Sequence, residues 1–141
     1  MSTRNTAIFD LDGTLLNSLQ DLTNSVNYCM KKYGGPSYTC EEIREKVGNG
    51  IYVLIEKSLP QGRSNPNYDA CMKEFPIHYK AHMLDNTKPY EGIMDALYRL
   101  KEHGYHLAIV SNKFRLRSEN LRPSIKNRHR ILFFRQCVNW M

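Results

Sequence analysis

The chain of 141 residues lacks any long hydrophobic run, which excludes a membrane-spanning helix. No apolar stretch approaches the roughly 20 residues that are needed to cross a bilayer. A secretory signal is also absent, because the short apolar stretch near the N-terminus leads directly into Asp10 and Asp12 without a small-residue cleavage site. We therefore expect a cytoplasmic protein with no membrane partner.

Closely spaced cysteines, repeats and low-complexity segments are absent as well. The four cysteines form no Cys-x-x-Cys pair and lie scattered at Cys29, Cys40, Cys71 and Cys137. This spacing argues against a disulfide framework or a zinc site and predicts buried thiols in a reducing compartment. Charged residues make up 24% and hydrophobic residues 41% of the chain, which is typical of a globular domain.

Acidic residues are scarce at the C-terminal end, and this scarcity produces the net charge of +6. Residues 1–112 contain 12 Lys and Arg against 13 Asp and Glu, whereas residues 113–141 contain 8 against a single acidic residue, Glu119. A basic tail favours nucleic acid or an acidic surface as a partner. No nucleic-acid motif accompanies it, so nucleic-acid binding is kept only as a minor alternative, and the sequence defines no oligomeric state.

The order of the predicted elements indicates a parallel α/β core interrupted by helices. Residues 6–9 and 106–110 are short apolar runs that predict two buried parallel strands. Between them, apolar residues at spacings of three and four predict five helices, at about residues 19–33, 39–47, 51–59, 68–83 and 93–103. Thr39 and Glu42 predict a capping box, Ile43 and Val47 an apolar face, and Pro76 a kink or break.

The most specific motif is residues 10–15 (Asp-Leu-Asp-Gly-Thr-Leu), directly after the first strand. Two carboxylates at this spacing could bind a divalent cation, or divide the roles of nucleophile and proton carrier. Gly13 and Thr14 offer backbone amides and a hydroxyl to an anion. Ser111 and Asn112 follow the second strand, and the carboxyl ends of parallel strands form the ligand-binding edge of such sheets. The alternatives are an acidic surface turn and an ordinary strand ending.

These motifs resemble those of the haloacid dehalogenase-like hydrolase superfamily, on the phosphoglycolate phosphatase-like branch with a helical cap. The resemblance runs from about residue 4 to 114. It implies a Rossmann-like parallel-sheet core at residues 1–16 and 88–141, incomplete at its C-terminal part, and an all-helical cap at residues 17–87. Residues 48–50 (Gly48, Asn49 and Gly50) resemble a cap loop that covers the substrate. A small phosphorylated metabolite is the implied substrate.

The resemblance also implies a mechanism. Asp10 would attack the substrate phosphorus to form an aspartyl-phosphate, and Asp12 would protonate the leaving group and then activate water. Mg²⁺ would be held by the Asp10 carboxylate and the Asp12 backbone carbonyl. Gly13, Thr14, Ser111 and Asn112 would bind the phosphate. A sugar-phosphate mutase of the same superfamily and a non-catalytic binding module are the alternatives.

The tail departs from the family pattern. The family places a lysine and an acidic pair downstream of the second motif, and neither stands at the expected place after Phe114. The residues after 114 therefore suggest a truncation or frameshift, with only about two strands left in the sheet. On this hypothesis we expect a marginally stable chain whose phosphatase activity is impaired.

Overall fold

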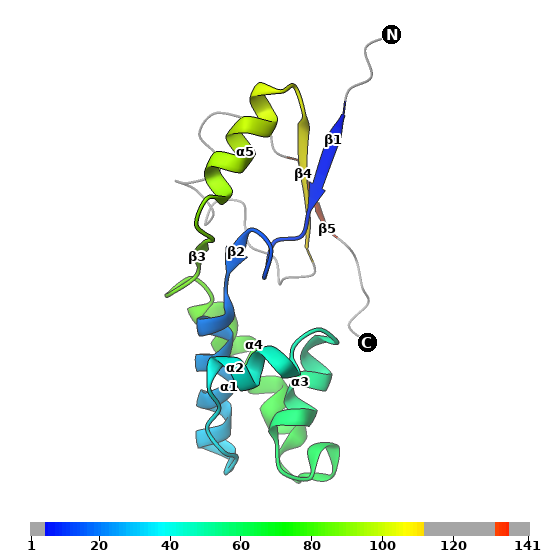
Figure 1. The fold of residues 1–141 in the computed structure, drawn as a ribbon. Helices are drawn as coiled ribbons and strands as arrows, with labels where there is room; N and C mark the ends of the chain where they lie inside the picture. The colour runs from blue at the N-terminus through cyan, green and yellow to red at the C-terminus, as the bar shows by residue number, and fades with distance from the viewer. Residues whose placement is uncertain (1–4, 112–131, 136–141) are drawn as a thin grey trace. The chain divides into compact units, whose positions relative to one another are not determined.

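The computed structural model describes residues 5–111 and 132–135 of the chain. The chain forms two compact units, which can be followed along the ribbon in Figure 1. One unit comprises Met1–Asn17 with Pro89–Met141, and the other comprises Ser18–Lys88. The first unit is called the sheet unit below, and the second is called the helical unit.

The sheet unit contains three parallel strands. β4 (His106–Ser111) lies between β1 (Thr6–Phe9) and β5 (Leu132–Arg135). β1 and β4 confirm the two strands predicted from the apolar runs. The expectation of only about two strands is wrong, because part of the basic tail pairs with the open edge of β4, with Ile109 beside Phe133. The α/β class with a small parallel sheet is thus established.

The core of the sheet unit lies on one face of β1 and β4, and α5 (Ile93–Glu102) covers it. Its buried residues come from the loop after β1, from α5 and from β4: Leu11, Leu15, Leu16, Leu97, Leu107 and Ile109. Ala7 and Phe9 pack against this cluster. As predicted, α5 ends before Gly104, which adopts a left-handed backbone with φ of 80°.

β1 is not the buried strand that the sequence predicts. Ile8 is 66% exposed, and Thr6 is exposed as well. Successive side chains of a strand point to opposite faces. Ala7 and Phe9 occupy the face that α5 covers, so Ile8 lies on the opposite face. In addition, β1 is an edge strand of the described sheet, with β4 as its one neighbour there. Burial on both faces was therefore the wrong inference from the apolar run.

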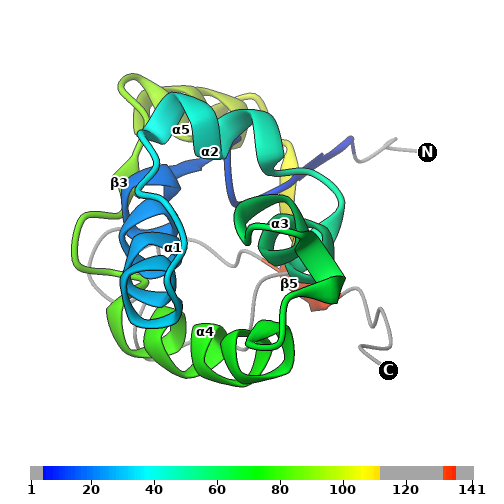
Figure 2. The same ribbon diagram turned by 90° about the horizontal axis from the view of Figure 1, so that it is seen from below.

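The helical unit consists of α1 (Leu19–Tyr33), α2 (Cys40–Lys46), α3 (Gly50–Ser58) and α4 (Tyr68–His82), with a 3₁₀ turn at Gly62–Ser64. Figure 2 shows the four helices around a common interior. Each contributes fully buried side chains, including Val26, Met30, Ile43, Ile55 and Phe75. Outside these helices, β2 (Leu16–Asn17) and β3 (Lys88–Pro89) pair as a two-stranded sheet.

Most local signals in the helical unit behave as predicted. Gly34 ends α1 with a left-handed backbone, and Thr39 and Glu42 form the capping box of α2. Two expectations are wrong. Val47 is 47% exposed, because it is the extended residue that ends α2 and its side chain leaves the apolar face. The break that was one of the two outcomes expected at Pro76 is absent, because α4 runs as one helix past it.

Three of the four cysteines lie in the helical unit. Cys29 and Cys71 are buried free thiols, as predicted, whereas Cys40 is a half-buried free thiol. Cys137 lies outside the described residues. None of the helices in the described ranges has the length and apolar character that crossing a membrane requires.

The capping box at α2 gives a testable stability effect. The Thr39 hydroxyl accepts a hydrogen bond from the Glu42 amide at 3.3 Å, and the Glu42 carboxylate accepts from the Thr39 amide at 2.7 Å. We expect Thr39→Ala to lower the free energy of unfolding by about 1 kcal/mol, because the N-cap acceptor is lost. Urea denaturation measures the change. Ser37→Ala, at an exposed position outside the helix, is the matched control and should change it by less than about 0.5 kcal/mol.

Candidate active site in the sheet unit

The parallel pairing of β1 and β4 brings the two sequence motifs to the same edge of the sheet. Phe9 pairs with Ile109, so Asp10 follows at the level of Val110, and Ser111 ends β4 one residue further on. Asp10 and Ser111, which are separated by most of the described chain, thus both lie at the carboxyl edge of the sheet. This edge is where open parallel sheets bind their ligands.

A tight turn shapes the motif that follows β1. The amides of Leu15 and Leu16 both donate to the Leu11 carbonyl, at 3.0 and 2.9 Å, and the Gly13 amide donates to the Leu16 carbonyl at 2.9 Å. Gly13 has φ of 78°, although a Cβ there would meet no neighbouring atom. Its backbone angle, and not a shortage of space, is therefore what favours glycine at this position.

Buried leucines anchor this turn, and its polar residues are left at the surface. Leu11, Leu15 and Leu16 are at most 3% exposed and belong to the core under α5. By contrast, Asp10 and Thr14 are exposed, and Asp12 and Ser111 are half-buried. The alternation of apolar and polar residues thus ties the turn to the core and presents its carboxylates to solvent.

The Asp10 carboxylate is oriented by its own backbone. Its Oδ1 accepts a hydrogen bond from the Leu11 amide at 2.7 Å. Within the described residues, its Oδ2 makes no hydrogen bond, so this oxygen is available to a ligand or an electrophile. The side chain is exposed, so an electrophile can reach it from solvent.

The donor set at this edge suits a hard divalent cation. Mg²⁺ commonly takes one or two carboxylates and completes its shell with water and substrate phosphate oxygens. The Asp10 and Asp12 side chains and the Asp12 carbonyl are oxygen donors of that kind. No group of three or more His, Cys, Asp or Glu in the described ranges could hold a metal. The Asp10 and Asp12 donors fit a Mg²⁺ ion that retains several non-protein ligands.

The remaining predicted site residues lie elsewhere. In the helical unit, Gly48 and Asn49 lie between α2 and α3 and Gly50 begins α3, with φ of 130° at Gly48 and 84° at Gly50. Asn112 lies outside the described residues. Asp10, Asp12, Gly13, Thr14 and Ser111 all belong to the sheet unit, and the structure thus groups these five.

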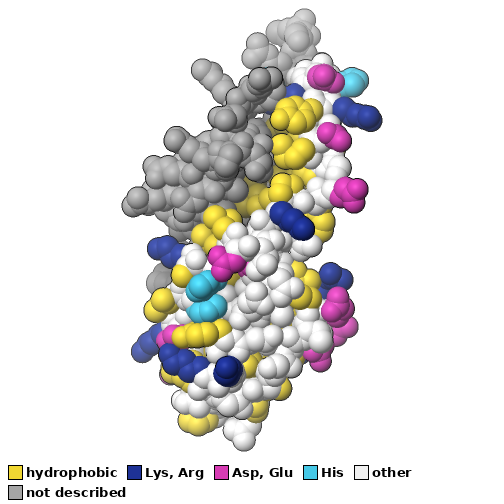
Figure 3. Space-filling view, turned by 90° about the vertical axis from the view of Figure 1, so that its left-hand side faces the viewer, with side chains coloured by type: hydrophobic (Ala, Val, Ile, Leu, Met, Phe, Trp, Pro, Cys, Tyr) yellow, Lys and Arg dark blue, Asp and Glu magenta, His cyan; other side chains and the backbone are white. Residues whose placement is uncertain are grey.

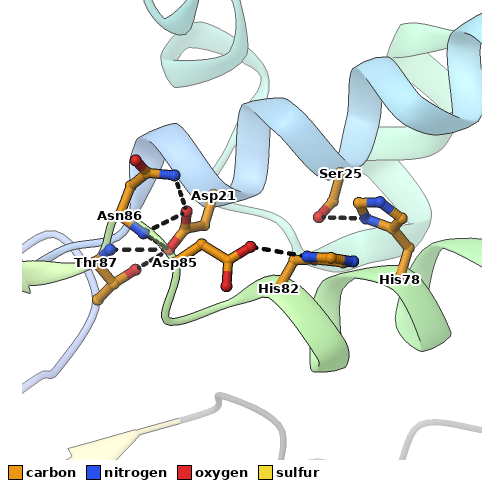
Figure 4. Close-up of polar contacts among 7 residues, drawn as sticks. All are labelled: Asp21, Ser25, His78, His82, Asp85, Asn86 and Thr87. Atoms are coloured by element: carbon orange, nitrogen blue, oxygen red, sulfur yellow. Dashed lines mark hydrogen bonds and ion pairs between the residues drawn. The ribbon is translucent and has the colours of Figure 1, made fainter.

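Asp21, a buried carboxylate in the helical unit, was not identified from the sequence. It lies in the first turn of α1 and is 1% exposed. Figure 4 shows its carboxylate facing the segment after α4, where it accepts from both amides and both side chains of Asn86 and Thr87, at 2.7–3.0 Å. These hydrogen bonds join the beginning and the end of the helical unit.

Opposing effects act on the pKa of Asp21. Burial raises the pKa of its carboxyl group, whereas the hydrogen bonds from Thr87 and Asn86 lower it, and the net result lies below the ordinary value of 3.8. The carboxylate is therefore the form that the fold stabilises. The sequence contains only a partial signal for this buried role. An aspartate in the first turn of a helix is normally explained by its favourable interaction with the helix dipole.

Comparison with known proteins defines the family. The family model for haloacid dehalogenase-like hydrolases matches residues 7–138 of the chain, beyond the stretch that carries the motifs. The chain belongs to the haloacid dehalogenase-like hydrolase family.

Curated relatives described as phosphoglycolate phosphatases align with this chain over about half of their own length. One from Agrobacterium fabrum is 35% identical over 114 residues, which are 76% of this chain and 47% of the relative. Another from Aquifex aeolicus is 34% identical over 110 residues, or 75% of this chain and 48% of the relative. The chain therefore spans about half the length of the curated relatives it matches.

Solved structures agree with the fold. A predicted phosphoglycolate phosphatase from Haemophilus somnus has a TM-score of 0.68 at 30% identity and is covered over 54% of its length, with 81% of this chain matched. A haloacid dehalogenase-like family hydrolase from Streptococcus pneumoniae has a TM-score of 0.67 at 27% identity, with 80% of this chain and 51% of that chain matched. The matched part of the α/β core and its inserted helices are thus shared with proteins of this family.

Proposed function

We propose that this chain carries out Mg²⁺-dependent hydrolysis of a small phosphomonoester through an aspartyl-phosphate, most like a phosphoglycolate phosphatase. The observation that carries the proposal is the exposed Asp10 carboxylate, which stands beside the end of β4 at the carboxyl edge of a parallel sheet. Family membership and relatives described as phosphoglycolate phosphatases support it.

Asp10 and Asp12 divide the chemistry. Asp10 Oδ2 attacks the phosphorus, and the bond from phosphorus to the leaving oxygen breaks as the leaving group takes a proton from the Asp12 carboxyl. A water then gives a proton to the Asp12 carboxylate and attacks the phosphorus. The bond from phosphorus to Asp10 breaks, which releases phosphate and restores the enzyme. The position of Asp12, two residues after Asp10 in the same turn, supports its role as the proton carrier.

The surrounding turn binds the phosphate. The backbone at Gly13 and Thr14 and the hydroxyl groups of Thr14 and Ser111 supply neutral donors at the same edge as Asp10. The Asp10 carboxylate and the Asp12 carbonyl would hold Mg²⁺, which supplies positive charge against the repulsion between the nucleophile and the phosphate. With two carboxylates and no third ligating side chain among the described residues, we expect weak Mg²⁺ binding and slow turnover.

We further propose that the helical unit is the cap of this enzyme, and that Gly48, Asn49 and Gly50 contact the substrate from it. Support comes from the compactness of Ser18–Lys88 as a separate unit, and from the positive φ values of Gly48 and Gly50, which glycine adopts without strain in the tight turn before α3. The cap would set which small phosphorylated acid is accepted.

Phosphate release from 2-phosphoglycolate tests the function. We expect slow release by the purified chain that rises with Mg²⁺ into the millimolar range and stops when EDTA is added, because a site with two carboxylates binds Mg²⁺ weakly. A colorimetric phosphate assay measures the rate. Glucose 1-phosphate, followed for glucose 6-phosphate, separates hydrolysis from mutase activity. Release that is unchanged by EDTA, or absent at saturating Mg²⁺, would contradict the proposal.

A further inference from the structure

Two buried thiols of the helical unit face each other, outside the candidate active site. Cys29 lies on α1 and Cys71 lies in the first turn of α4, and both side chains are 0% exposed. The two thiols hydrogen-bond to each other, so their sulfur atoms lie within hydrogen-bonding reach. Because the two residues are far apart in the sequence, it is the packing of α1 against α4 that brings this pair together.

Polar contacts nearer the surface hold the same two helices together. Lys32 Nζ lies 2.9 Å from Oε1 of Glu74, and the Tyr28 hydroxyl donates to the same oxygen at 3.1 Å. The ring of His78 stacks on Tyr28 at 3.9 Å, and its Nδ1 lies 3.0 Å from the Ser25 hydroxyl. Figure 3 shows histidine and charged side chains at one surface of the helical unit. These contacts join α1 to α4 and limit how far the two buried thiols can separate.

The two thiols differ in how readily they ionise. The hydrogen bond to Cys71 raises the pKa of Cys29, and burial raises it further. The hydrogen bond from Cys29 lowers the pKa of Cys71, against the opposing effect of burial. The thiolate is the nucleophilic form of a cysteine. We therefore expect Cys71 to react first with an electrophile, with Cys29 beside it as the second thiol.

We propose that Cys29 and Cys71 form a disulfide when hydrogen peroxide oxidises the chain, and that this bond locks α1 to α4. The Cys71 sulfur attacks one peroxide oxygen, the O–O bond breaks, and the leaving hydroxide takes the Cys71 proton, which gives a sulfenic acid and water. The Cys29 sulfur then attacks the Cys71 sulfur and the S–O bond breaks. The hydroxide that leaves takes the Cys29 proton and becomes the second water. The peroxide is reduced, the two thiols are oxidised, and a dithiol reductant reverses the bond.

Peptide mapping of the full chain after treatment with hydrogen peroxide tests the bond. Free thiols are alkylated in urea, and trypsin then places Cys29, Cys40 and Cys71 in three separate peptides. We expect the Cys29 and Cys71 peptides to be joined and to separate after dithiothreitol. Cys40→Ser removes a half-buried thiol of the same unit, and as the matched control it should leave the yield of joined peptides within twofold of the parent. Full alkylation of Cys29 and Cys71, or a bond from either one to Cys40 or Cys137 instead, would overturn the proposal.

The effect of the bond on the fold is measured separately by urea denaturation. A bond between α1 and α4 closes a loop that contains much of the helical unit, and this restricts the unfolded chain. We expect the oxidised parent to unfold at a higher urea concentration than the reduced parent. In Cys71→Ala, the peroxide-treated and reduced forms should share one midpoint, whatever the cost of the substitution itself. An unchanged or lower midpoint in the oxidised parent would reject the lock. Because no readout is phosphate release, failure here leaves the proposed hydrolase function intact.

Discussion

Replacing Asp10 with asparagine is expected to reduce phosphate release by at least about 10³-fold, because the amide cannot form the acyl-phosphate. The structure predicts little cost to the fold. The side chain is exposed, and an asparagine oxygen can still accept the hydrogen bond that Oδ1 takes from the Leu11 amide at 2.7 Å. Steady-state phosphate release and thermal unfolding, measured on the same preparation, separate the two effects.

Two companion variants sharpen this result. Asp95→Asn, an exposed aspartate on α5 of the same unit, should leave the rate within twofold. Asp12→Asn should slow both chemical steps, and the slower breakdown should let a phosphoryl group accumulate on Asp10 after acid quenching, visible by intact-mass measurement. Full activity in Asp10→Asn would show that another group is the nucleophile and would reject the proposed mechanism.

Replacing Asp21 with asparagine is expected to destabilise the helical unit by about 2–4 kcal/mol, which is a large part of the stability of a small domain. The carboxylate is 1% exposed and faces only donors: the amides of Asn86 and Thr87 and their two side chains. An asparagine amide would place an N–H against one of these donors. Urea denaturation followed by circular dichroism measures the loss, and Asp69→Asn, an exposed aspartate on α4, should change stability by less than about 1 kcal/mol.

The same site predicts a dependence on acid. The folded pKa of Asp21 lies below its ordinary value of 3.8, so the unfolded chain binds this proton more readily than the folded one. The stability that the carboxylate contributes is therefore complete above about pH 4 and is lost as the pH falls through the folded pKa. Unfolding measured between pH 5 and 2 should show a steeper loss in the parent than in Asp21→Asn. Parallel pH curves would show that Asp21 is not ionised in the fold.

Much of the local structure could be predicted because its causes are local. Gly34 ends α1, the Thr39 and Glu42 side chains cap α2, and the apolar runs become β1 and β4, since each depends on residues within a few positions. The Asp10–Asp12 motif was also identifiable in the sequence, and its resemblance to a known motif indicated the family. The errors at Val47 and Ile8 concern which face of an element is covered, and no short pattern contains that information.

By itself, the sequence determined the α/β class, the helical insertion and the pair of motifs that carries the proposed chemistry. Only the tertiary structure decided that Leu132–Arg135 pairs with β4, that Asp21 is buried against Asn86 and Thr87, and that Tyr28, His78 and His82 stack across two helices. The physical reason is the same in each case. A hydrogen bond, a parallel strand pair or a ring stack between residues far apart in the chain forms only when folding brings its partners together.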